Sequence, residues 1–234
     1  MNKTAQQFER AAEHYHEHAV IQQWVRDDML AQLGATQGLW LDVGCGPQVQ
    51  ALGDDCIGID LAYYRGSTRV QACTEAIPLQ NKSVHGIFSN MALQWCEQPL
   101  NAIDEWARVC KLGAKIACSV TCAGNFAELV HAYNKVGLPC PVQPTLPATA
   151  WVSLFGAKFS LIHHHVHSYQ LQFDNIRDLM QHIKETGANA PTQDSGIRSQ
   201  TALERLENSM QRTETGKLPL TYKVVSLTAI KSYD

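Results

Sequence analysis

The chain has little charge and no long apolar run. Only 18% of its 234 residues are Asp, Glu, Lys or Arg, and the formal net charge at pH 7 is −3. A nucleic-acid-binding surface is basic, and no run of Lys or Arg supplies one here, so we expect no nucleic-acid partner. A membrane-spanning helix needs about 20 consecutive apolar residues, and no segment provides them, so we expect no membrane partner.

Paired cysteine motifs are also missing. Eight cysteines are present, but none falls in a CxxC framework, and they lie within apolar patterns typical of strands and helices. We interpret them as reduced, buried small side chains. Residues 1–10 are polar, without the apolar run of a signal peptide, and we therefore expect a cytoplasmic location.

The apolar content is sufficient for one hydrophobic core. At 45% apolar over 234 positions, we expect a single domain, residues 1–234. It would consist of N-terminal helices in residues 1–34, a cofactor-binding half in residues 35–122, and substrate-side helices and closing strands in residues 123–234. Alternating strand and helix patterns predict an α/β fold with a doubly wound sheet.

Apolar periodicity places the main elements. Helical spacing is found in residues 4–19 and 21–33, and again in 103–110 and 175–186. Strand patterns cover residues 84–89 and 116–121, with a closing strand in 224–230. A passage with four prolines, residues 139–147, predicts a loop before a helix and strand in residues 148–172.

The most informative segment is an apolar strand that ends in Asp42, Gly44 and Gly46, followed by a second strand that ends in Asp60. Glycine allows a tight turn and close approach of a ligand to the backbone. A carboxylate at the end of the neighbouring strand can accept hydrogen bonds from both ribose hydroxyls. This combination indicates a nucleoside pocket and points to S-adenosylmethionine.

The connection between these two strands is short. Gly46 and Asp60 are 60 − 46 = 14 positions apart, which leaves one or two helical turns in residues 48–53. Residues 61–70 are similarly short, and we expect no helix there.

Six motifs occur in order along the chain: Phe8–Tyr15, Asp42–Pro47, Asn90–Trp95, Phe126–Leu129, Ile183–Ala188 and Leu218–Tyr222. Together they resemble one family, the malonyl-acyl-carrier-protein O-methyltransferases of biotin synthesis. The resemblance implies a class I methyltransferase fold, Rossmann-like, with a mostly parallel seven-stranded sheet, an antiparallel last hairpin and helical additions on the substrate side.

The resemblance also implies an activity. A methyl group would pass from S-adenosylmethionine to the free carboxylate of a malonyl thioester, an early step of biotin synthesis. The partner would be acyl carrier protein carrying the thioester, or malonyl-CoA. A carboxylate is already ionised near neutral pH, so the reaction needs alignment and exclusion of water but no general base. We expect no metal.

Matching positions suggest the site residues. Tyr15 is the candidate catalytic residue, and the candidate substrate-binding residues are Trp95, Lys184 and Arg198. Lys184 and Arg198, with Arg205, Arg212 and Lys217, would face the acidic carrier protein. The candidate cofactor-binding residues are Asp42, Gly44, Gly46, Asp60, Thr74 and Asn90.

Alternatives remain for several residues. Cys73 stands where relatives carry an Asp, so adenine would be bound by Thr74, by a backbone carbonyl, or by stacking on Tyr63 or Tyr64. Tyr15 and Trp95 could be core aromatics, and the basic residues could be solubilising. The three alternating histidines 163, 165 and 167, and His14 with His18, could bind a metal, or could lie on solvated surfaces.

Two other functions also fit the sequence. The chain could methylate another small acid or a quinone-like ring with the same cofactor, or it could be a degenerate, non-catalytic module that only binds partners.

Overall fold

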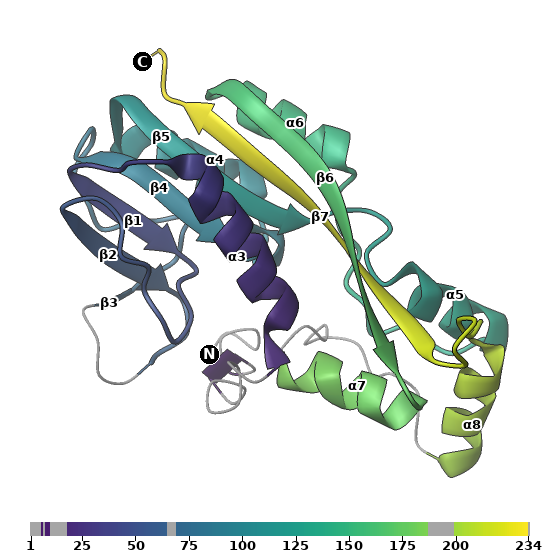
Figure 1. Ribbon diagram of the computed structural model, residues 1–234. Coiled ribbons are helices and arrows are strands. Elements are labelled where there is room, and N and C mark those ends of the chain that lie inside the picture. Colours follow the sequence, from purple (N-terminus) through teal and green to yellow (C-terminus); the bar gives the residue numbers. More distant parts are fainter. Residues whose placement is uncertain (1–5, 7, 10–17, 65–68, 187–198, 234) are drawn as a thin grey trace.

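The computed structural model describes residues 6, 8–9, 18–64, 69–186 and 199–233. Seven strands form one sheet in the order β3-β2-β1-β4-β5-β7-β6 (Figure 1). Strand β7 is antiparallel to both of its neighbours, and the other neighbouring strands are parallel. The strands are β1 (Leu39–Val43), β2 (Asp55–Asp60), β3 (Arg69–Gln71), β4 (Val84–Asn90), β5 (Cys110–Thr121), β6 (Ser160–Phe173) and β7 (Leu218–Ile230).

Helices cover both faces of this sheet, which confirms the predicted α/β class. Figure 1 shows α3 on one face, α4 and α6 on the other, and α5, α7 and α8 around the far end of β6 and β7. The helices are α3 (Val20–Leu33), α4 (Pro99–Val109), α5 (Ala127–Val136), α6 (Ala148–Gly156), α7 (Ile176–Glu185) and α8 (Gln200–Ser209), with a 3₁₀ turn η1 (Leu93–Trp95).

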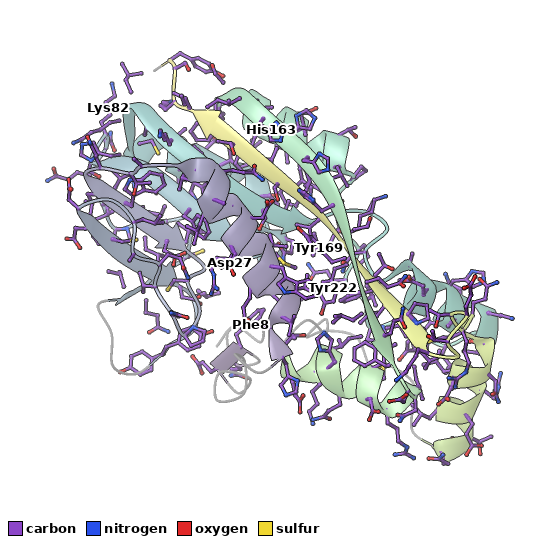
Figure 2. All side chains as sticks on the ribbon, viewed as in Figure 1. Phe8, Asp27, Lys82, His163, Tyr169 and Tyr222 are labelled. Carbon is purple, nitrogen blue, oxygen red and sulfur yellow. The ribbon has the colours of Figure 1, made fainter. Side chains whose placement is uncertain are left out.

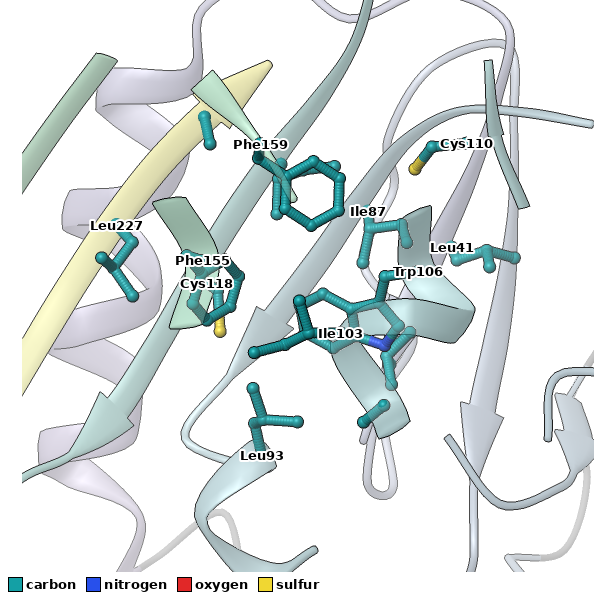
Figure 3. Close-up of a cluster of buried hydrophobic side chains, with 14 of the residues drawn as sticks. Leu41, Ile87, Leu93, Ile103, Trp106, Cys110, Cys118, Phe155, Phe159 and Leu227 are labelled. Carbon is teal, nitrogen blue, oxygen red and sulfur yellow. The ribbon is translucent and has the colours of Figure 1, made fainter. Parts of the chain in front are cut away.

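The sheet separates two hydrophobic cores. Successive residues of a strand point to opposite faces, so Trp40 and Leu41 of β1 belong to different cores. On one face, Trp106 of α4 packs edge-on against Phe155 of α6, with 5.9 Å between ring centroids (Figure 3). On the other face, α3 contributes residues four positions apart, from Ile21 to Leu33.

The prediction of helical turns after the glycine turn is wrong, because residues 44–54 form turns and irregular backbone. Their backbone N–H groups bind outside the segment instead of forming helical hydrogen bonds. The N–H of Gln50 donates to the Asp42 carboxylate at 2.8 Å, and that of Gly53 donates to the Thr36 hydroxyl at 2.7 Å. Leu52 is buried, which anchors the middle of the connection.

The structure confirms some of the other expectations and does not describe or support others. The helix expected in residues 4–19 lies mostly outside the described residues, whereas the proline-containing passage is a connection as expected. All eight cysteines are free, but only Cys110, Cys118 and Cys122 are buried, and the others are half-buried. Within the described ranges, no helix combines the length and apolarity needed to cross a membrane. The expected domain division stays a prediction.

Candidate functional site

The glycine turn follows β1 at the carboxyl edge of the parallel strands. Gly44 and Gly46 have φ values of 71° and 58°, in the left-handed region that favours glycine. A Cβ on Gly44 would lie 2.1 Å from Cβ of Ala92, so the close approach of the next segment also requires glycine there. The N–H of Gly44 donates to the carbonyl of Ile59 at 2.7 Å, which fixes the turn against β2.

Asp60 lies where β2 ends, beside this turn. Its Oδ2 accepts the N–H of Gly46 at 2.9 Å, and its Oδ1 accepts the N–H of Ala62 at 2.8 Å. Each carboxylate oxygen has two lone pairs, so these bonds orient the group without using up its accepting capacity. The orientation suits a ligand with two neighbouring hydroxyls.

A cavity of about 310 Å³ opens between the turn and α4. That volume is in the range of small-molecule sites. A Cβ on Gly46 would meet no atom within 4 Å, so this backbone borders open space. Six of the predicted residues line the cavity: Gly44, Gly46, Asp60, Thr74, Asn90 and Trp95.

Asp42 does not line that cavity. It lines a smaller neighbouring one, of about 60 Å³, between the turn and α3. The residue is only 3% exposed. Gly44, Gly46 and Asn90 border both cavities, so the two are adjacent parts of one site.

Hydrogen bonds to other elements fix the side chains of Asn90 and Thr74. Nδ2 of Asn90 donates to the carbonyl of Gln22 on α3 at 2.9 Å, and its Oδ1 accepts from the Ser119 hydroxyl at 2.8 Å. The Thr74 hydroxyl accepts from the indole N–H of Trp106 at 2.8 Å. Its own proton can therefore still be donated toward a ligand.

Cys96 also lines the larger cavity, beside the predicted Trp95. Burial raises the pKa of the Cys96 thiol to about 12, and the charge of Glu75 adds to this increase. Because the thiolate is the nucleophilic form, Cys96 is not a nucleophile at neutral pH.

A third cavity of about 40 Å³ adjoins the first and shares Phe8, Met91 and Trp95 with it. Phe8 comes from the N-terminal segment and Tyr222 from β7, and both line this chamber (Figure 2). Trp95 is half-buried and contacts Phe8 edge-on, with ring centroids 5.5 Å apart. We call this cavity the side chamber.

The polar lining of the side chamber is neutral in the described part of the chain. It consists of Gln22, Gln94, Thr121, Asn125, Gln143, Thr145, Thr186 and Tyr222. The Oε1 atoms of Gln22 and Gln94 are buried and have no hydrogen-bond partner among the described residues. The sequence patterns did not predict this lining, although the polar Gln22 on the apolar face of α3 indicated it.

Backbone strain is concentrated around the side chamber. Met91 and Phe126 both line it and have positive φ values, 51° and 55°, which are rare for residues other than glycine. Strained backbone of this kind persists where surrounding contacts hold it, often at functional sites. The N–H of Met91 donates to the carbonyl of Ser119 at 2.9 Å, which supplies such a contact.

The remaining predicted residues lie away from these cavities or outside the described residues. Tyr15 and Arg198 lie outside the described residues. Lys184 is exposed on α7 and lines none of the three cavities. Of the other basic residues, Arg212 pairs with Glu207, and Lys217 pairs with Asp174 at 2.6 Å.

The alternating histidines lie along the edge strand β6, where Figure 2 labels His163 and Tyr169. The rings of His163 and His165 stack with 6.5 Å between centroids, and both residues are exposed. Burial lowers the pKa of His167, and the neighbouring His165 adds to the lowering. The described residues contain no group of three or more His, Cys, Asp or Glu side chains arranged to hold a metal.

Comparison with known proteins places this site in a family. Residues 41–118, from β1 through most of β5, match the methyltransferase domain family. A malonyl-[acyl-carrier protein] O-methyltransferase from Alcanivorax borkumensis is 32% identical over 97% of this chain and 86% of its own length. The chain belongs to this family. The relative of the same name from Erwinia billingiae is 29% identical over 94% of each chain.

Membership of this methyltransferase family makes the chain an S-adenosylmethionine-dependent methyltransferase. Solved structures support the fold alone. The YcgJ protein of Bacillus subtilis superposes with a TM-score of 0.59 at 17% identity, covering 90% of this chain and 98% of its own. The [4+2]-cyclase SpnF superposes with a TM-score of 0.55 at 14% identity, covering 91% and 81%. Because a cyclase shares the fold, the fold by itself does not define the reaction.

Proposed function

We propose that this chain transfers the methyl group of S-adenosylmethionine to the free carboxylate of a malonyl thioester carried by acyl carrier protein. The relatives named for that reaction cover most of the chain at 26–32% identity, and this similarity carries the proposal. Such methylation is an early step of biotin synthesis, as the family resemblance implies.

The residues of the larger cavity fit the cofactor. Asp60 presents two oriented oxygens to the ribose, and Gly44 and Gly46 let the backbone approach the ligand closely. Thr74 can donate its hydroxyl proton to the adenine. One amide proton of Asn90 is bound to the carbonyl of Gln22. The second could form a hydrogen bond where the methyl donor and the methyl acceptor meet.

The side chamber fits the acceptor. When bound, S-adenosylmethionine supplies an electrophilic methyl group on a positively charged sulfur. A carboxylate acceptor loses its charge during methyl transfer, so the transition state is less charged than the reactants. A small chamber lined by neutral amides and hydroxyls therefore favours the transition state over the separated ions.

Neutral donors also preserve the nucleophile. The side chains of Asn125 and Gln143 can orient a carboxylate by hydrogen bonds without pairing it with a full positive charge. Tyr15 and Trp95 remain candidates for covering and contacting the acceptor. No residue is needed as a general base.

Acyl carrier protein would dock near α7 and α8. Lys184 is exposed, and the ion pairs within the described residues do not include it. Arg205 is exposed on α8, and its side chain donates to the carbonyl of Val136 at 3.3 Å. With Arg198, these residues are the proposed docking cations. We also propose a cytoplasmic location, because all eight cysteines are free and free thiols persist in reducing compartments.

The test is methyl transfer with purified protein and S-adenosylmethionine labelled in its methyl group. Malonyl-acyl carrier protein should accept the label as a methyl ester, and malonyl-CoA should accept it less efficiently. Label on a different acid or on a quinone instead would overturn the proposed acceptor. Binding of the cofactor without transfer to any of these acceptors would favour a non-catalytic module.

Docking is tested separately. Lys184→Glu with Arg205→Glu should raise KM for the carrier-bound substrate and leave KM for malonyl-CoA unchanged. Lys111→Glu is the matched control, because Lys111 lies at the start of β5 beside His85. Equal loss on both substrates would contradict docking at α7 and α8.

A further inference from the structure

Two opposite charges line the smaller cavity between α3 and the glycine turn. Arg26 comes from α3, and Asp42 from the end of β1. Asp42 accepts the N–H of Gln50, which holds its carboxylate in place. A ligand group that carries both a positive and a negative charge would therefore find a complementary partner for each.

The connection after the turn lacks the usual source of positive potential. In many nucleotide-binding sites, a helix begins right after the glycine turn, and its N-terminal N–H groups bind an anionic part of the ligand. Residues 44–54 contain no helix here. The anionic end of a ligand therefore needs another partner.

Arg26 is the one cation among the described residues that line these two cavities. The larger cavity is lined by the acids Asp60, Glu75 and Glu97 and by no Lys or Arg. The smaller one adds Asp42 and Arg26. Within the described part of the lining, Arg26 is therefore the side chain that attracts an anionic group, and the acids Asp42, Asp60, Glu75 and Glu97 repel it.

The present partner of Arg26 is easily exchanged. Its guanidinium donates to Oδ1 of Asp27, the next residue, from Nε at 2.9 Å and from Nη2 at 2.8 Å. The Asp27 side chain is 63% exposed. Exposed ion pairs contribute little to stability, so a ligand carboxylate could replace Asp27 at small cost.

We propose that Arg26 binds the carboxylate of the amino-acid part of S-adenosylmethionine, while Asp42 faces its ammonium group. The proposal rests on the cofactor site of the proposed function and adds a binding residue to it. The planar guanidinium can form two parallel hydrogen bonds with a carboxylate, which a lysine cannot. Arg26 thus takes over the role that the N-terminus of a helix would have.

The experiment compares two ligands by calorimetry with the full chain. S-Adenosylhomocysteine has the amino-acid part, and 5′-methylthioadenosine lacks it but keeps the adenosine. Arg26→Gln should weaken binding of S-adenosylhomocysteine about 10- to 100-fold and change that of 5′-methylthioadenosine less than about twofold. Arg177→Gln, which changes an exposed arginine on α7 that lines none of the three cavities, is the matched control and should change neither.

Two further variants keep the test decisive. Arg26→Lys keeps the positive charge but loses the two parallel hydrogen bonds of the guanidinium, so it should weaken S-adenosylhomocysteine binding by a smaller factor. If Arg26→Gln does not fold, Arg26→Lys serves as the test variant. Asp27→Asn removes the competing carboxylate and should not weaken binding.

Each other outcome contradicts a specific claim. If Arg26→Gln weakens both ligands equally, or neither, the role of Arg26 is refuted while the cofactor site stands. If the unaltered chain binds neither ligand, the cofactor site itself is refuted, and the role of Arg26 with it.

Discussion

Asp60→Asn gives the sharpest test of the cofactor site, because it replaces one oxygen by an NH₂ group at nearly constant size. In the structure, the two oxygens of Asp60 accept the N–H groups of Gly46 and Ala62 at 2.9 and 2.8 Å. Whichever way the amide is turned, its NH₂ faces one of these backbone donors. The variant therefore loses one accepted hydrogen bond and brings two donors together.

The size of the effect follows from the charge of the acceptor. A hydrogen bond to a charged group contributes about 1.5–3 kcal/mol. We expect the lower half of that range for unfolding, because Asp60 is only half-buried. The same loss at a ribose hydroxyl corresponds to about 10- to 150-fold weaker cofactor binding.

Calorimetry with S-adenosylhomocysteine measures the affinity, and urea unfolding measures the stability. Asp55→Asn is the matched control, because Asp55 begins the same strand and is exposed at its other end. An analogue without the two ribose hydroxyls should bind Asp60→Asn and the unaltered chain equally. If Asp60→Asn binds S-adenosylhomocysteine within about twofold of the unaltered chain, Asp60 does not hold the ribose.

Three further predictions concern stability. Burial, with the nearby His18, lowers the pKa of His182 from 6.5 to about 4. The unfolded chain then takes up this proton between pH 6.5 and 4 and the folded chain does not, so stability falls as the pH drops through that window, by about 3 kcal/mol. Urea unfolding should show a weaker pH dependence for His182→Gln, and an unchanged one would refute this. Thr74→Val leaves the indole N–H of Trp106 without its acceptor and should cost about 1–3 kcal/mol in urea unfolding, with Thr74→Ser nearly neutral; equal costs would contradict the bond. Phe155→Ala removes a fully buried ring and should lower the free energy of unfolding by about 3–5 kcal/mol. A loss below about 1 kcal/mol would mean that the surrounding core closes the space left by the ring.

The parts of the site that the sequence predicted are those that depend on local pattern. A glycine turn after an apolar strand and an acid at the end of the next strand must meet at one edge of a parallel sheet. Gly44, Gly46 and Asp60 accordingly line one cavity. Asp42 has the same origin, yet it lines the neighbouring cavity. Val43, the next residue of β1, lines the larger one, because successive strand residues point to opposite faces.

The side chamber could not be predicted in this way. Its polar side chains are neutral in the described part of the chain. They come from α3, η1, β5, β7, two connections and the C-cap of α7, and they are neighbours only in the folded chain. Gln94 lies within the Asn90–Trp95 motif, beside the predicted Trp95, but the motif gave it no role. Burial without a hydrogen-bond partner marks it, and that is visible only in three dimensions.

The missing helix has a similar cause. The spacing between Gly46 and Asp60 allows a helical turn, and local propensity gives no reason against it. Hydrogen bonds to Asp42 and Thr36 use the N–H groups of residues 50 and 53 instead. These acceptors lie 8 and 17 positions away, so a reading of residues 48–53 alone could not identify them.

The shortened connection makes α3 part of the cofactor site, and cofactor binding should therefore stabilise the docking of α3. Asn90 already holds the carbonyl of Gln22, and Arg26 would add a contact through the ligand. At a ligand concentration of about 100 times Kd, binding raises the free energy of any opening that releases the ligand by about 2.7 kcal/mol. Hydrogen exchange of α3 amides should slow when S-adenosylhomocysteine is added, and that of α8, which lines none of the cavities, should change less under conditions of local opening. Equal slowing in both helices would mean that the ligand stabilises only the fold as a whole and that α3 is no more part of the site than α8.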